Sequence, residues 1–215
     1  MKKKIVLAVI AAALVLAAAI GTTFASFNTS SDPGTTEINL NDMQVALAAS
    51  VEGDTVVDLI TNGLPGQEET VNNFFVSNKG GENDYDVFTR VVIDKQWEDR
   101  ELDASKIKLF IGEDELNAET LAEGKDLAGW MLVEAEDEQI ILYNKAVLTP
   151  GNSTSEFLTK VAFDSDMNNA YTDQEALITV TVQSVQATAA EKSMPAEWGV
   201  YPVFDSEGNL IGVEE

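Results

Sequence analysis

Residues 176–185, Ala-Leu-Ile-Thr-Val-Thr-Val-Gln-Ser-Val, decide the fold class. Apolar and polar side chains alternate along the whole stretch, and successive side chains of a strand point to opposite faces of a sheet. β-Branched residues are also enriched in strands. The stretch therefore predicts a long strand with one face buried in a core.

Shorter runs of the same character recur on both sides of this strand, bounded by Gly, Pro or Asn. Residues 38–47 alternate with a slip near Asn41. The other runs lie at residues 56–60, 70–77, 87–93, 106–111, 130–133, 139–143 and 157–163. Eight or more short strands with little helix predict a mainly β protein, an antiparallel β-sandwich or jelly roll.

Two segments interrupt this pattern. Residues 94–129 are charged and contain the best helical candidate, 115–124, so we expect a small α-containing insertion in a β-sandwich domain of residues 38–190. The tail, residues 191–215, has a turn at Gly208 and predicts a terminal hairpin of 200–204 with 210–213.

The composition excludes several classes of function. The chain has 13 basic and 37 acidic residues, a net charge of -24, and neither His nor Cys. Nucleic-acid binding needs a basic surface, and zinc sites and His-dependent nucleophiles need residues that are missing. With so many carboxylates, acidic pairs carry no information about hydrolysis. We therefore expect no enzyme and no nucleic-acid partner.

The N-terminus has the layout of a signal peptide. Three lysines precede an apolar run from Ile5 to Ile20, and small residues follow. Thr23 and Ala25 suit the positions before a cleavage site, so we expect a signal peptide of residues 1–25 and a mature chain beginning at Ser26. The alternative is an uncleaved membrane anchor, for which the run is short.

Cleavage would leave 10 basic and 37 acidic residues, a charge of about -27, because residues 1–25 contain three lysines and no acid. Copies of such a chain repel one another at low salt. Residues 26–37 are rich in Ser, Thr and Asn and include Asp32-Pro33-Gly34, which predicts a flexible arm or loop.

A calcium site is one candidate. In residues 164–175, oxygen-bearing side chains fall at the spacing of an EF-hand loop, with Asp164, Asp166, Asn168 and Glu175 as ligands. Position six, however, is Asn169 where the loop favours glycine. The alternative is a polar loop between two strands.

A second candidate is an isopeptide cross-link through Lys160, which lies between Leu158 and Ala162 on one strand. Desolvation would favour the neutral, nucleophilic amine that such chemistry needs. The alternative is that this face of the strand is exposed and Lys160 is solvated.

Three stretches together resemble the TasA/camelysin family of exported proteins. The first is 1–27, which ends in Gly-Thr-Thr-Phe-Ala-Ser-Phe and is similar to signals cut by a SipW-type signal peptidase. The second is the Leu-Pro-Gly turn at 64–66 with the strand and Asn-x-Gly of 72–80. The third is 167–171 followed by the long strand 178–187 ending in Val-Gln-Ala.

The resemblance implies a jelly roll, secretion to a cell-surface matrix, and homopolymeric fibres in which the N-terminal arm inserts into a neighbouring subunit. Phe27 would be the apolar anchor of that arm. A calcium-stabilised surface adhesin is the alternative. Part of the family is also labelled as surface protease. This sequence has no His and therefore no His-Glu-x-x-His helix, so we set that label aside.

Overall fold

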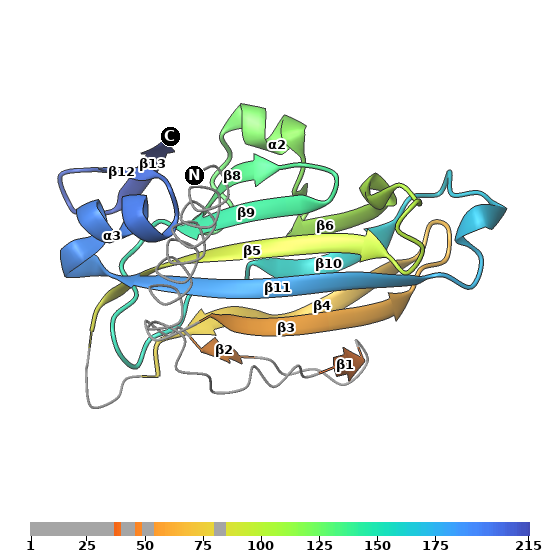
Figure 1. The fold of residues 1–215 in the computed structure, drawn as a ribbon, viewed down its shortest axis with the longest axis horizontal. Coiled ribbons are helices and arrows are strands. Elements are labelled where there is room, and N and C mark those ends of the chain that lie inside the picture. Colours follow the sequence, from red (N-terminus) through yellow and green to blue (C-terminus); the bar gives the residue numbers. More distant parts are fainter. Residues whose placement is uncertain (1–36, 40–45, 49–53, 80–84) are drawn as a thin grey trace, which may run out of the picture. The chain divides into compact units, whose positions relative to one another are not determined.

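The computed structural model describes residues 37–39, 46–48, 54–79 and 85–215. The expected signal peptide, its cleavage residues Thr23, Ala25 and Ser26, the anchor Phe27 and the arm up to residue 36 lie outside the described residues. Within the described part, strands dominate and form two large sheets and one small one (Figure 1).

The larger sheet has six strands in the order β1-β3-β11-β5-β9-β8. Their bounds are β1 Glu37–Asn39, β3 Thr55–Asn62, β11 Glu175–Gln186, β5 Val87–Trp97, β9 Gln139–Asn144 and β8 Trp130–Ala135. The long strand predicted from residues 176–185 is β11, and it pairs antiparallel with β5 from Ala176 opposite Trp97 to Gln186 opposite Val87. It therefore lies at the centre of the sheet.

The second sheet has five strands in the order β2-β4-β10-β6-β7. Their bounds are β2 Ala46–Ala48, β4 Glu68–Ser77, β10 Leu158–Phe163, β6 Ile107–Ile111 and β7 Asp114–Glu115. One hydrophobic cluster joins inward-facing residues of both sheets, with Phe74 and Phe157 from the second sheet side packing edge-to-face and Trp130 contacting Phe157. The predicted β-sandwich is therefore confirmed.

Alternate residues of β5 point to opposite faces of the six-stranded sheet. Val91, Ile93 and Trp97 belong to the core between the sheets, whereas Phe88 on the opposite face packs against the C-terminal tail. A strand with both faces partly covered is expected to carry apolar residues on each. The first half of β5 has apolar residues on both faces, such as Phe88 on one and Val91 on the other.

The first two strands depart from the antiparallel pattern. β1 pairs with β3 in parallel, and β2 pairs with β4 in parallel. Alternation of apolar residues predicts that a segment is a strand, but it carries no information on the direction of its partner. The described residues of the stretch 38–47 belong to two strands in different sheets, Glu37–Asn39 and Ala46–Ala48.

The helical insertion is narrower than residues 94–129. β5 continues to Trp97, and β6 pairs with β10 as a full member of its sheet, so both belong to the scaffold. The inserted part is the helix α2, Ala118–Glu123, between β7 and β8. The Asn117 side chain accepts a hydrogen bond from the Thr120 amide at 2.9 Å, and Gly124 ends the helix with φ 60°.

The C-terminal tail forms the expected hairpin, β12 Tyr201–Phe204 and β13 Leu210–Glu214. The helix α3, Ala190–Glu197, precedes it and was not predicted. Met194 of this helix and the following Trp198 pack on the outer face of the six-stranded sheet. The Cζ atom of Arg90 lies 5.1 Å from the centre of the Trp198 ring. Three short 3-10 turns complete the described elements: η2 Ala104–Lys106, η3 Asn169–Tyr171 and η4 Ala187–Ala189.

Candidate functional site

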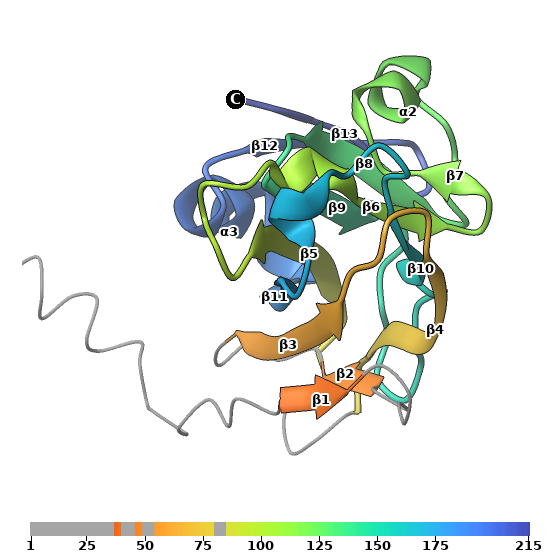
Figure 2. The same ribbon diagram turned by 90° about the vertical axis from the view of Figure 1, so that its right-hand side faces the viewer.

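On one side of the sandwich, each sheet ends in a three-residue strand, β1 or β2, that covers only part of the long strand beside it. β3 has eight residues, and β1 pairs with residues 58–60 alone. β4 has ten residues, and β2 pairs with residues 75–77 alone. The four strands lie together at the bottom of Figure 2. Among the described strands, none lies beside the rest of β4 on this side.

The opposite side of the sandwich is protected against such pairing. The edge strand β8 has an irregular register between Leu132 and Glu134, and α2 packs against it. The edge strand of the other sheet, β7, is two residues long. Bulges, covering helices and very short edge strands are the means by which proteins block strand addition. The described parts of the two sides therefore differ in one respect, since a bulge and a helix cover the β8 edge.

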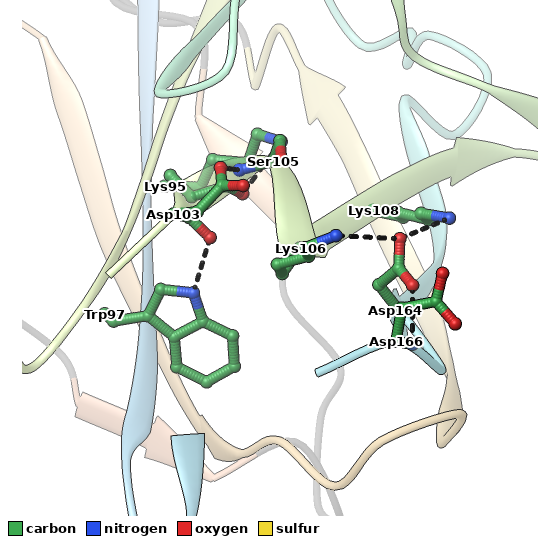
Figure 3. A network of polar contacts seen from close by, with 9 residues as sticks. Lys95, Trp97, Asp103, Ser105, Lys106, Lys108, Asp164 and Asp166 are labelled. Carbon is green, nitrogen blue, oxygen red and sulfur yellow. Dashed lines mark hydrogen bonds and ion pairs between the residues drawn. The ribbon is translucent and has the colours of Figure 1, made fainter. Parts of the chain in front are cut away.

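A buried lysine fastens the chain crossing from β5 to β6 (Figure 3). Lys95 is 7% exposed, and its Nζ donates hydrogen bonds to the carbonyl oxygens of Ala104 at 3.3 Å and Ile107 at 2.6 Å. Burial lowers the pKa of Lys95 to about 8, although the charges of Asp137 and other nearby carboxylates act in the opposite direction.

The carboxylate of Glu69 lies near the turn that joins β3 to β4. The buried Thr61 of β3 donates its hydroxyl to both oxygens of Glu69 of β4, at 3.2 Å each. The Gln67 side-chain amide donates to Glu69 Oε1 at 2.7 Å. Among the described residues, Glu69 is half-buried and has no ion pair. We call Thr61, Gln67 and Glu69 the edge cluster.

The expected calcium ligands do not gather around a common point. Asp164 Oδ2 lies 3.2 Å from Lys108 Nζ and 3.6 Å from Lys106 Nζ (Figure 3). Its Oδ1 accepts the Asp166 amide at 2.8 Å, and this bond and the lysines hold the pKa of Asp164 below its usual value. Asn168 accepts the Ala170 amide at 2.8 Å.

Glu175, the remaining expected ligand, is exposed at the start of β11. In the part of the chain that the structure describes, no three acidic side chains form a group that could hold a metal ion. The oxygen-bearing side chains instead accept hydrogen bonds from the loop's own backbone and pair with lysines. This geometry favours the polar loop over the EF-hand interpretation of residues 164–175.

Lys160 also differs from what an isopeptide lysine requires. Its Nζ lies 3.7 Å from Glu68 Oε2 and 4.2 Å from the centre of the Phe110 ring, and its side chain is 21% exposed. The lysine that is buried with a lowered pKa is Lys95, whose Nζ contacts carbonyl oxygens. The sequence signal for the burial of Lys95 is its spacing of two residues from the apolar Ile93 and Trp97, which places all three on the same face of β5.

Comparison with protein-family models, curated proteins and solved structures finds no match for this chain. None of the helices in the described ranges is long and apolar enough to span a membrane. The functional argument therefore rests on the geometry of the described residues: one side of the sandwich covered by a bulge and a helix, one side with short, parallel edge strands, and the edge cluster beside it.

Proposed function

We propose that this protein is an exported structural subunit of an extracellular fibre, whose copies join head to tail by donating an N-terminal strand. The observation that carries the proposal is the partly covered side formed by β3 and β4. A strand from another chain can extend such a side by backbone pairing. The role is structural and requires no catalytic centre.

Strand pairing can supply enough free energy for such a contact. Residues 68–74 of β4 have no described strand beside them on this side. A donated strand of that length forms roughly six backbone hydrogen bonds at about 0.5–1.5 kcal/mol each. Burial of an aromatic residue such as Phe27 adds about 1.5–3 kcal/mol.

This gain must exceed the repulsion between chains that each carry a charge of about -27 after cleavage. Salt screens that repulsion, with a screening length of about 8 Å at physiological ionic strength. A head-to-tail contact does not close on itself and therefore grows filaments instead of dimers. Fibre growth should accelerate as the salt concentration rises.

The test is electron microscopy of purified mature protein that begins at Ser26. We expect fibres from this protein, and a folded monomer after deletion of residues 26–37. Phe27→Asp should slow assembly and leave the melting temperature of the domain unchanged. If the deleted protein still forms the same fibres, strand donation by the arm is wrong.

A further inference from the structure

We propose that the edge cluster forms a covalent bond within the chain. The bond is an ester between the hydroxyl of Thr61 and the side-chain carbonyl carbon of Gln67, and Glu69 is the general base that makes it. The inference concerns these three side chains and does not depend on strand donation. It gives a chemical role to a hydroxyl, an amide and a carboxylate that meet inside the β3–β4 corner.

The hydroxyl of Thr61 is placed as a nucleophile. Thr61 is 8% exposed and alternates with the core residues Val57 and Leu59, so it lies on the inner face of β3. Its Oγ1 donates to both carboxylate oxygens of Glu69 at 3.2 Å each. A hydroxyl is a weak nucleophile until an adjacent base takes its proton, and a hydrogen bond from the hydroxyl to the base is the arrangement that this step requires.

The carboxylate of Glu69 is suited to take that proton. Glu69 is half-buried, and its spacing of two residues from the buried Val71 places it on the inner face of β4. The side chains that donate to it, Thr61 and Gln67, are both neutral. Among the described residues, no lysine or arginine forms an ion pair with it. A nearby cation would lower the basicity of a carboxylate, so this environment favours proton transfer.

The amide of Gln67 is held at both of its polar atoms. Its Nε2 donates to Oε1 of Glu69 at 2.7 Å, and its Oε1 accepts the backbone N–H of Leu64 at 3.2 Å. The first contact places the leaving nitrogen beside the base that returns the proton. The second places a donor where negative charge develops on the carbonyl oxygen during attack, as an oxyanion hole does. The nucleophile and the leaving group therefore share one carboxylate oxygen, Oε1 of Glu69.

The reaction balances without an added reagent. The Gln67 side chain turns about its single bonds to bring Cδ to the hydroxyl, and Thr61 Oγ1 forms a bond to Cδ while Glu69 accepts the hydroxyl proton. The same carboxylate then delivers this proton to Nε2, the bond between Cδ and Nε2 breaks, and ammonia leaves. Because ammonia dilutes into the solvent, the step does not readily reverse.

The ester would close a covalent ring over the turn that carries the chain from the six-stranded sheet to the five-stranded sheet. Gln67 is already tied to the second sheet, because the Phe163 amide donates to its backbone oxygen at 2.9 Å. A pull that separates β3 from β4 at this corner would then act on a covalent bond. The chain contains no Cys, so a disulfide cannot serve this purpose.

The test is the mass of purified mature protein. We expect the folded wild type to be lighter than its sequence by one ammonia, and mild alkali to add one water by opening the ester. Residues 62–66 contain neither Lys nor Arg, so one tryptic peptide carries both ends of the bond. Backbone breakage between residues 61 and 67 of this peptide should yield no separate fragments, because the ester still joins them.

Three variants assign the roles. Thr61→Val removes the nucleophile at similar size and Gln67→Glu removes the leaving amide, so each should keep its full sequence mass. Glu69→Gln keeps an oxygen acceptor and should slow bond formation about a hundredfold or more, the usual contribution of a general base. Glu68→Gln is the matched control, since its carboxylate faces Lys160, and it should react like wild type.

Two outcomes would overturn the proposal. One is a folded wild type of full sequence mass, which would leave the edge cluster as hydrogen bonds alone. The other is a loss of ammonia that persists in Thr61→Val, because Asn62 followed by Gly63 can also lose ammonia by cyclising to a succinimide, which needs no hydroxyl. Should Thr61→Val fail to fold, the wild-type peptide decides, since a succinimide lets breaks between Gly63 and Gln67 yield separate fragments.

Discussion

Gly63 leaves no room for a side chain, and we predict that Gly63→Ala destabilises the fold. A Cβ atom at this position would lie 2.7 Å from Cδ1 and Cε1 of Phe163 and 2.7 Å from Cη2 of Trp97. Carbon atoms in good contact are about 3.5–4.0 Å apart, so the new atom would overlap both rings by close to 1 Å. The backbone of Gly63 does not lie in the left-handed region. The effect is therefore one of packing alone.

The rings have little freedom to move. Phe163 is 3% exposed and Trp97 is 1% exposed, and Trp97 also packs edge-on against Tyr171 at 5.1 Å between ring centres. Overpacking a core of this kind costs about 1–3 kcal/mol. Replacing glycine by alanine recovers about 0.4–1 kcal/mol by restricting the unfolded chain. We expect a net loss of about 1–2 kcal/mol in the free energy of unfolding.

Urea denaturation of mature protein measures this loss as a lower midpoint with an unchanged slope. The matched control is Gly212→Ala in β13, where a Cβ atom would meet the nearest Val203 atom at 3.7 Å, an ordinary contact. We expect the control to be neutral or slightly stabilising. If Gly63→Ala and Gly212→Ala have the same midpoint, the close approach of the rings does not constrain the fold and the reasoning is wrong.

Two further predictions concern ions. The pKa of Lys95 is about 8 in the folded protein and 10.5 ordinarily. Between pH 8 and 10.5 the unfolded chain therefore binds more protons than the folded one. Raising the pH through this range should stabilise the fold by up to about 3 kcal/mol. Denaturation from pH 7 to 10.5 should show this rise in wild type relative to Lys95→Met; parallel curves would contradict it. Millimolar calcium should leave the melting temperature unchanged, because Asp164 is paired with Lys106 and Lys108. A rise that Asp166→Ala abolishes would instead restore the calcium site.

The strand content of this protein could be predicted from local sequence. Alternation places β11 and the pair β8 and β9 where the structure has them, because burial of one face requires a period of two residues. Helix α2 follows from its cap residues, Asn117 and Gly124. These features depend on neighbours within a few positions along the chain, which is why a single sequence contains them.

The candidate site was less predictable. Thr61 and Glu69 are eight residues apart and meet only because β3 and β4 belong to different sheets joined by a turn. Lys160 and Lys95 both lie in strands with apolar neighbours, yet one faces outward and the other the core. The oxygen spacing of residues 164–175 suited calcium, but Asp164 pairs with Lys106 and Lys108, which lie more than fifty residues earlier in the chain.

The sequence by itself determined that this is a mainly β chain, highly acidic and without the residues of zinc or His-dependent chemistry. Only the tertiary structure decided that Gly63 is required for the approach of two rings, that β1 and β2 pair in parallel, and that one side of the sandwich is left partly uncovered. The physical reason is that strand direction, sheet partners and ring contacts depend on residues distant in sequence, whereas alternation and composition do not.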